Sequence, residues 1–295
     1  MGAIRQAATR KPGAEAGRTQ AVASAGVTNP PAEHVLAAFG VAATEPELLA
    51  GGQGATWRCG DTVLKPAASS AEAAWIANTF EQLRVDGIRL ARPIRSSDGR
   101  WVVGGWTAQH FVAGRPDDRY ADILQAADLL HAAIADIPEP NFLRRRDDLY
   151  SWADRLAWGE VEDVDGRIAE GHAAQLYARL AAGRVAVSAT PQVVHGDMFG
   201  NVLFAATAPP AIVDFTPYWR PASWAAAVIV VDAISWGGAT TELVQACADR
   251  EDWPEMLRRA LLFRLGVSLA HPRSTAESLV EILAAAEVLT DHIDR

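Results

Sequence analysis

The stretch VVHGDMFGNVLF occupies positions 193–204, and AIVDF follows at positions 211–215. Three side chains with hard oxygen atoms, Asp197, Asn201 and Asp214, stand at the ends of the short apolar runs in these two stretches. Short apolar strands can present polar side chains at their ends without burying them unpaired. The pattern therefore predicts a strand, a tight polar turn and a second pair of strands that ends at a carboxylate.

These residue types suit phosphoryl transfer, in which catalysis is mostly positioning and neutralisation of phosphate charge. Asp197 is the candidate catalytic residue, because it could accept or orient the proton of an attacking hydroxyl. Asn201 and Asp214 are candidate metal ligands, since Mg²⁺ prefers oxygen ligands and completes its shell with phosphates and waters. His195 is better interpreted as an organiser of the loop, because imidazole is a poor ligand for Mg²⁺. A lone His-Gly-Asp is a common turn, whereas the whole constellation is hard to obtain by chance.

The lysines give independent support, because the chain has only two, Lys11 in the N-terminal segment and Lys65 at the end of an apolar run. A retained lysine indicates a site that needs a compact ammonium group rather than a planar guanidinium group. Lys65 is therefore a candidate phosphate ligand. An ordinary lysine at a strand end is the alternative.

A glycine-rich turn precedes this strand at Gly51, Gly52, Gln53 and Gly54. Glycines here allow positive φ angles and let backbone N–H groups approach phosphate oxygens. A simple hairpin turn is equally compatible with the glycines alone. The order of glycine loop, strand, turn and strand with Lys65 favours a hairpin that covers a nucleotide.

A helix is expected after Ser69 or Ser70, either of which could be its N-cap, and runs to about Leu83. Glu72 in the first turn is predicted to pair with Lys65 and hold it toward the phosphates, with Glu81 as the second choice. The alternative for Glu72 is an acid that interacts only with the helix dipole.

These motifs resemble the aminoglycoside phosphotransferase and choline kinase superfamily, which are small-molecule kinases with a protein-kinase-like fold. His195-Gly196-Asp197, Asn201 and Asp214-Phe215 carry the resemblance, and the extended motif looks like a group of members from high-GC Gram-positive bacteria. The family usually places the asparagine five residues after the aspartate, whereas here it is four. Thr216 replaces the glycine or acid often found two residues after the metal-binding aspartate.

The resemblance implies an α+β, bilobal protein-kinase-like fold, with a small N-terminal antiparallel β-sheet lobe and a larger, mainly helical C-terminal lobe. Residues 1–28 are expected to form a disordered tail and 29–108 the nucleotide-binding lobe. Residues 109–115 would be the crossover, and 116–295 the helical lobe with the catalytic loop and the acceptor site. Strands are expected near 89–94 and 101–106. Helices are expected near residues 31–39, 119–135, 147–159, 166–182, 222–236, 253–270 and 274–292.

The composition of the chain agrees with these expectations. The chain has 295 residues, is 49% hydrophobic and carries two cysteines, which fit a reducing cytoplasm better than a disulfide scaffold. It lacks a run of eighteen apolar residues and the apolar core of a signal peptide, so no membrane association is expected. Residues 1–115 carry a net charge of +3 and residues 116–295 a net charge of −12.

An acidic helical lobe would attract a cationic acceptor such as an amino sugar, and it argues against nucleic acid as a partner. The sequence thus favours an ATP- and Mg²⁺-dependent phosphotransferase that acts on a hydroxyl group of a small molecule, with a cationic compound as a candidate acceptor. A pseudokinase or nucleotide-sensing module without transfer activity is the alternative, motivated by the short loop and Thr216. A structural partner protein that binds no nucleotide is a third reading.

Overall fold

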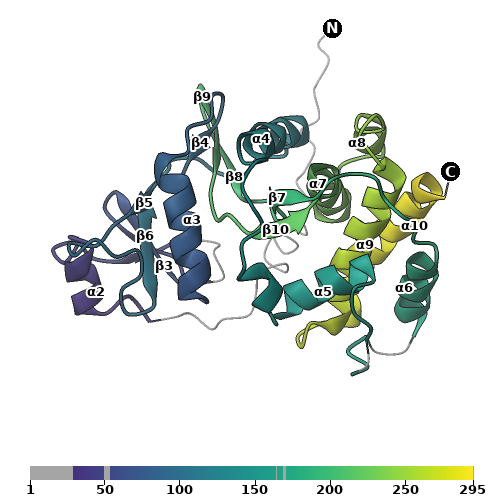
Figure 1. Cartoon of the computed structure of the whole chain (residues 1–295), viewed down its shortest axis with the longest axis horizontal. Coiled ribbons are helices and arrows are strands. Elements are labelled where there is room, and N and C mark those ends of the chain that lie inside the picture. Colours follow the sequence, from purple (N-terminus) through teal and green to yellow (C-terminus); the bar gives the residue numbers. More distant parts are fainter. Residues whose placement is uncertain (1–28, 50–53, 164, 169–170, 295) are drawn as a thin grey trace, which may run out of the picture.

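The computed structural model describes residues 29–49, 54–163, 165–168 and 171–294. These residues form two lobes that lie side by side (Figure 1). A small sheet with helices α2 and α3 makes the N-terminal lobe, and helices make most of the C-terminal lobe. The expected tail, residues 1–28, lies outside the described residues.

The N-terminal sheet has the strand order β1-β2-β3-β6-β5, and all its pairs are antiparallel. Its strands are β1 (Glu47–Leu48), β2 (Trp57–Cys59), β3 (Thr62–Pro66), β5 (Pro93–Ile94) and β6 (Trp106–His110). Strands β2 and β3 form the expected hairpin, and Lys65 lies on β3 opposite Thr107 of β6.

Alternation along β3 and β6 gives this sheet two distinct faces. Leu64 and Ala108 lie opposite each other and are buried in a small core against helix α2 (Glu33–Ala38). Lys65 and Thr107 lie on the other face. Helix α3 (Ser70–Gln82) stands between the sheet and the helical lobe (Figure 1). The Ser69 side chain accepts a hydrogen bond from the Glu72 backbone N–H, which confirms Ser69 as the N-cap.

A second sheet joins the two lobes. Strand β4 (Arg89–Leu90) pairs in parallel with β9 (Ala208–Ile212), which pairs with β8 (Val202–Ala205). The prediction of one strand over residues 89–94 is therefore wrong, because β4 and β5 belong to different sheets. The second expected strand is also displaced, since β6 begins at Trp106, where the prediction ends.

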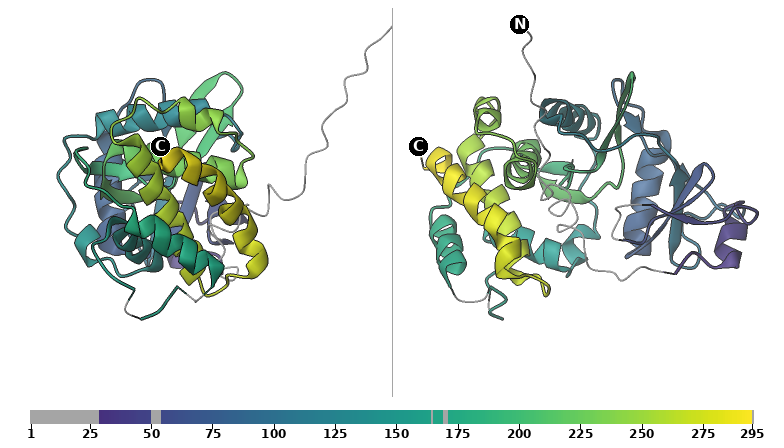
Figure 2. Two further views of the ribbon diagram at one scale, coloured as in Figure 1. Left: turned by 90° about the vertical axis from the view of Figure 1, so that its right-hand side faces the viewer. Right: turned by 180° about the vertical axis from the view of Figure 1, so that it is seen from behind.

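The C-terminal lobe is built around α7 (Ala222–Trp236) and α9 (Trp253–Ala270), both almost wholly buried. A helix that is apolar on all sides belongs inside a core, and α7 is such a helix apart from Asp232 and two serines. Figure 2 shows α10 and α6 flanking this centre at the end of the molecule far from the N-terminal sheet. The other helices are α4 (Tyr120–Ala133), α5 (Leu149–Trp158), α6 (His172–Ala182), α8 (Glu242–Gln245) and α10 (Ala276–Ile293), with a 3₁₀ turn, η2, at Leu143–Arg145.

The expected helices all occur in the expected order, and those for α7 and α9 agree at both ends, whereas the short helix α8 was not expected. Helix α6 begins at His172, later than expected. The segment after Asp214 contains β10 (Pro217–Arg220), which pairs with β7 (Gln192–His195). Within the described residues, no helix is long and apolar enough to cross a membrane.

Candidate functional site

The candidate catalytic loop follows the buried strand β7, whose last residue, His195, lies opposite Pro217 of β10. The backbone N–H of Gly196 donates to the carbonyl of Thr216 at 3.0 Å. A Cβ atom at position 196 would lie 2.3 Å from Cδ2 of Tyr218, whose ring is buried against Trp224 and Phe263. Only glycine fits this close approach, so residue 196 fixes the path of the chain into Asp197.

His195 organises the loop from within. The side chain is fully buried, and its Nδ1 accepts hydrogen bonds from the backbone N–H groups of Asp197 (3.2 Å) and Thr216 (3.4 Å). Burial lowers the pKa of His195 to about 4, although the charge of Asp214 opposes the shift. The imidazole is therefore neutral at neutral pH, and its Nδ1 is free to accept both bonds.

Asn201 lies against Asp197 despite the short four-residue spacing. Its Nδ2 donates to the Asp197 carbonyl at 2.7 Å and approaches Oδ2 of the Asp197 carboxylate at 3.4 Å. Because the amino group faces Asp197, the amide Oδ1 remains available, with no hydrogen-bond partner within the part of the chain that the structure describes. The short loop thus still presents an oxygen atom beside the carboxylate.

Asp214 follows β9 in a left-handed conformation, with φ at +56°. Such angles are uncommon for residues other than glycine and gather at functional sites, where surrounding structure enforces them. Here the Val213 N–H donates to the Asn201 carbonyl at 3.0 Å, and the Thr216 hydroxyl donates to the Asp214 carbonyl at 3.3 Å. These bonds bring the Asp214 carboxylate next to the catalytic loop.

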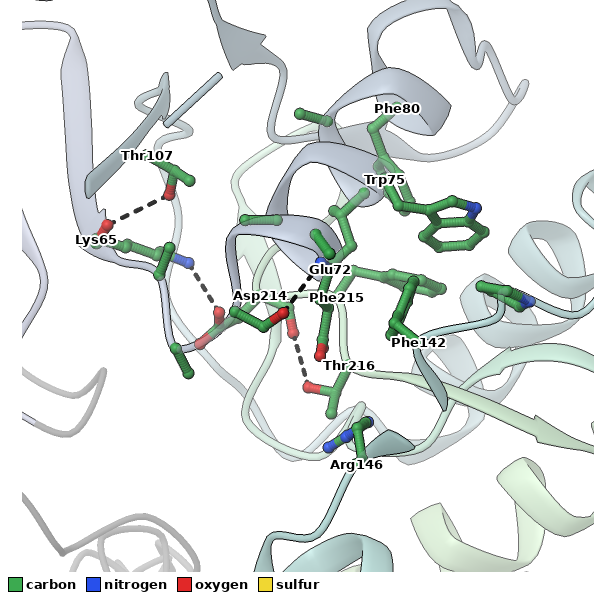
Figure 3. A pocket seen from close by; sticks show the side chains of 18 of the residues that line it. Lys65, Glu72, Trp75, Phe80, Thr107, Phe142, Arg146, Asp214, Phe215 and Thr216 are labelled. Carbon is green, nitrogen blue, oxygen red and sulfur yellow. Dashed lines mark hydrogen bonds and ion pairs between the residues drawn. The ribbon is translucent and has the colours of Figure 1, made fainter. Parts of the chain in front are cut away.

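Lys65 pairs with Asp214 and not with Glu72. Its Nζ lies 3.1 Å from Oδ1 of Asp214, although the two residues are 149 positions apart (Figure 3). The ammonium group, together with a hydrogen bond, lowers the pKa of the Asp214 carboxyl below its ordinary value against the effect of burial. The expected pair with Glu72 is corrected, and so is the second choice, because Glu81 binds Arg95 bidentately at 2.9 Å.

Glu72 faces the helical lobe instead, above Arg146 and Thr216 (Figure 3). Burial raises the pKa of its carboxyl, and the nearby charge of Arg146 opposes that shift. Arg146 is itself fixed, since it bonds Asp148 at 3.1 Å and the Pro217 carbonyl at 3.0 Å. Glu72 is therefore placed by α3 on the wall of the pocket and away from the ammonium group of Lys65.

Three rings connect α3 to the catalytic loop. Phe80 of α3 packs on Phe215 with ring centroids 4.8 Å apart, and Phe215 packs edge-on against His195 at 5.2 Å. Phe80 belongs to the large core of the helical lobe. Helix α3 therefore contacts Phe215, which directly follows Asp214, and through Phe215 it contacts His195 at the start of the catalytic loop.

A buried arginine that the sequence did not single out touches the candidate catalytic residue. Arg264 of α9 donates from Nη2 to Oδ1 of Asp197 at 2.8 Å. The same guanidinium group binds both carboxylate oxygens of Asp232 on α7, with Nε to Oδ1 at 2.7 Å. Burial lowers the pKa of Arg264, but the two carboxylates outweigh this and raise it above its ordinary value. Asp232 is thus connected to the catalytic loop through Arg264.

Several of these groups line one pocket of about 1050 Å³ between the lobes, whereas His195, Asn201 and Asp232 are not part of its lining. Lys65 and Thr107 line it from the sheet, Glu72 from α3 and Asp214 from the helical side (Figure 3). Asp197 is a further lining residue. The aromatic side chains Trp75, Phe142 and Tyr150 also line it. The pocket therefore combines apolar walls with a few converging charged groups, as small-molecule sites generally do.

The expected phosphate-binding residues Gly51, Gly52 and Gln53 lie outside the described residues. Gly54 is described and has a positive φ of +69°. Strands β1 and β2, which precede and follow it in the sequence, pair in antiparallel register, with Leu48 opposite Trp57. Gly54 thus lies, in sequence, between neighbouring strands of the sheet that carries Lys65.

No protein-family model matches the chain, and no curated protein matches it. Several solved structures, by contrast, are similar to the chain. An aminoglycoside phosphotransferase from Alicyclobacillus acidocaldarius is 17% identical, with a TM-score of 0.60 over 90% of this chain and 95% of that one. A microcompartment-associated aminopropanol kinase is 15% identical, with a TM-score of 0.57 over 89% and 95% of the two chains. A spectinomycin phosphotransferase in complex with ADP and spectinomycin is 12% identical, with a TM-score of 0.56 over 88% and 96%. The likeness confirms the bilobal, kinase-like α+β fold.

Proposed function

We propose that this protein transfers the γ-phosphoryl group of ATP to a hydroxyl group of a small molecule. One observation carries the proposal: Lys65, Asp197 and Asp214 come from distant parts of the chain and line one pocket between the lobes. A base, a metal-binding carboxylate and a phosphate-binding ammonium group are the parts that kinase-type transfer requires. The fold shared with solved small-molecule phosphotransferases supports the same assignment.

The donor atoms fit a magnesium ion that is shared with the nucleotide. Asp214 offers a carboxylate and Asn201 offers the amide oxygen that Asp197 leaves free. No group of three or more His, Cys, Asp or Glu side chains that could hold a metal occurs among the described residues. Mg²⁺ commonly uses one or two protein oxygens and takes its other ligands from phosphates and water. When bound, the ion would neutralise phosphate charge, while Lys65 would release Asp214 and contact phosphate oxygens.

Backbone groups of the crossover can hold the adenine edge. The Phe111 N–H donates to the Asp61 carbonyl at 2.7 Å, and Arg115 exchanges two hydrogen bonds with Phe204. Between these fixed points, the N–H groups of Val112 and Ala113 have no hydrogen-bond partner in the described part of the chain. Strand β6 runs to His110, so these N–H groups belong to the part of the expected crossover, residues 109–115, that follows the strand.

In the transfer step, a carboxylate oxygen of Asp197 would take the proton as the acceptor hydroxyl oxygen bonds to the γ-phosphorus. The bond from that phosphorus to the bridging oxygen breaks, and ADP leaves with its electron pair. Asp197 is suited to this role because its side chain reaches the pocket and is 26% exposed.

We propose a cationic acceptor, such as an amino sugar or another basic compound. The net charge of −12 on residues 116–295 favours attraction of a cation. Glu72 and Asp147 line the pocket without an ion-pair partner among the described residues. Their carboxylates could bind an ammonium group of the acceptor.

Calorimetric titration with ATP, with and without Mg²⁺, tests the nucleotide site. Wild type should bind ATP more tightly with the metal, and Asp214→Asn should lose that gain. Asp136→Asn, an exposed aspartate outside the pocket, is the matched control and should bind like wild type. Equal affinity with and without Mg²⁺ in wild type would contradict the proposal.

Asp197→Ala should abolish transfer to an identified acceptor while ATP binding persists. Full transfer by this variant would show that Asp197 is not the base. Metal-dependent ATP binding by wild type without transfer to any hydroxyl compound would favour the second candidate, a pseudokinase or nucleotide-sensing module. The observation that favours this second candidate is that Lys65 pairs with Asp214 instead of Glu72.

A further inference from the structure

Arg264 distinguishes the two oxygens of the Asp197 carboxylate. Oδ1 accepts a hydrogen bond from Nη2 of Arg264 at 2.8 Å, whereas Oδ2 lies on the side of Asn201, 3.4 Å from its Nδ2. One oxygen is therefore held by a buried cation, and the other accepts, among the described residues, only the longer hydrogen bond from Asn201. An aspartate without this contact could rotate about its side-chain bonds and present either oxygen.

Asp232 makes the guanidinium group a rigid support. It binds Arg264 through both carboxylate oxygens, and the side chains of Asp232 and Arg264 are 2% and 4% exposed. A bidentate pair of this kind fixes the plane of the guanidinium group as well as its position. Helices α7 and α9 carry the pair and pack closely along each other. The orientation of Asp197 is thus set by the core of the helical lobe.

We infer that Arg264 is a positioning residue, which holds Asp197 so that Oδ2 faces the acceptor hydroxyl. It acts through Asp197 and contributes no proton of its own, since it remains protonated between its two carboxylates. The inference rests on the proposed phosphotransfer function. Because the nucleotide contacts proposed above come from other residues, loss of Arg264 should reduce kcat and leave the affinity for ATP unchanged.

The difficulty in testing a buried ion pair is that removal of one partner leaves the other unpaired in the core, which can unfold the protein. The double variant Arg264→Gln with Asp232→Asn avoids this, because it replaces two charges by two amides that can bond each other. Arg259→Gln is the matched control, because it leaves Glu255 paired with Arg258. Arg259 is a buried arginine of the same helix that pairs with Glu255, and it lies outside the pocket lining.

The experiment measures ATP turnover with Mg²⁺ and water as the acceptor, together with ATP affinity by calorimetry, on variants shown to be folded by circular dichroism. The double variant should lose about 10²-fold in kcat, the size expected for a misplacement of about 1 Å. Its ATP affinity should match wild type, and Arg259→Gln should keep the wild-type kcat. A folded double variant with wild-type kcat would overturn the inference while the proposed function stands.

Crystal structures of wild type and of the double variant give a readout that needs no acceptor. The Asp197 carboxylate should turn away from its wild-type position or occupy more than one. An unchanged carboxylate in the double variant would refute the inference whatever the turnover. By contrast, a wild type that binds no ATP would refute the proposed function, and the structures would still decide the role of Arg264.

Discussion

Because the side chain of His131 is buried, we expect the folded protein to be less stable at pH 5 than at pH 7. It lies on α4 with an exposed fraction of 2%, and its Nε2 accepts a hydrogen bond from the His195 backbone N–H at 3.0 Å. Burial, helped by the nearby His195, lowers the pKa of His131 to about 3. In the unfolded chain the pKa would be about 6.5.

The direction of the change in stability with pH follows from the number of protons that the folded and the unfolded states bind. Between pH 6.5 and 3 the unfolded chain carries a proton on His131 that the folded protein excludes, so stability falls as the pH decreases through this window. From pH 7 to pH 5 the loss is about 2 kcal/mol, because each pH unit below 6.5 contributes about 1.4 kcal/mol while the folded imidazole stays neutral. This is a large part of the net stability of an ordinary domain.

The test compares wild type with His131→Gln by urea unfolding at pH 7, 6 and 5. Glutamine keeps an acceptor for the His195 N–H but does not titrate, and the contributions of carboxylates common to both proteins cancel. The free energy of unfolding of wild type should therefore fall by about 2 kcal/mol more than that of His131→Gln between pH 7 and 5. His172→Gln, which replaces an exposed histidine, should follow wild type. Parallel pH dependences for wild type and His131→Gln would refute the reasoning.

Three further substitutions test local features of the fold. Gly196→Ala should lower the free energy of unfolding by about 1–3 kcal/mol, because the added methyl group collides with the buried ring of Tyr218; an unchanged denaturation midpoint would contradict this. Gly114→Ala should weaken ATP binding measured by calorimetry, since φ is +149° and the new Cβ would lie 2.9 Å from Cβ of Leu203, next to the crossover; wild-type affinity would argue against it. Thr275→Ala removes the capping box of α10 and should destabilise the protein by about 1 kcal/mol in thermal unfolding, whereas full stability would show that this cap contributes nothing.

The features that could be predicted from the sequence are those with a local cause. The N-cap at Ser69 depends on a side chain three positions from its partner, and α7 and α9 have long apolar patterns that define their ends. The loop from His195 to Asn201 is likewise local, since its glycine and its short polar residues suit a tight turn. These local signals were sufficient to predict which lobe comes first along the chain.

Short strands were predicted poorly. Strand β4 has two residues, too few for alternation to be seen, and its partner β9 lies about 120 positions later. Strand β10 was not expected, yet pairing with β7 makes its four residues a strand. Such strands exist because a partner offers hydrogen bonds in the folded protein, and the sequence of the strand itself carries little trace of this.

The amino-acid sequence alone specifies which chemical groups this protein possesses and the order in which they occur: a lysine on an early strand, then an aspartate, an asparagine and a second aspartate on turns. Their interaction partners depend on the folded arrangement. Lys65 binds Asp214 across 149 positions in place of Glu72, which is seven positions away, and Arg264 reaches Asp197 from a helix 67 positions later. The physical reason is that ion pairs form between charges that folding brings within about 4 Å and removes from water, and separation along the chain does not enter that balance.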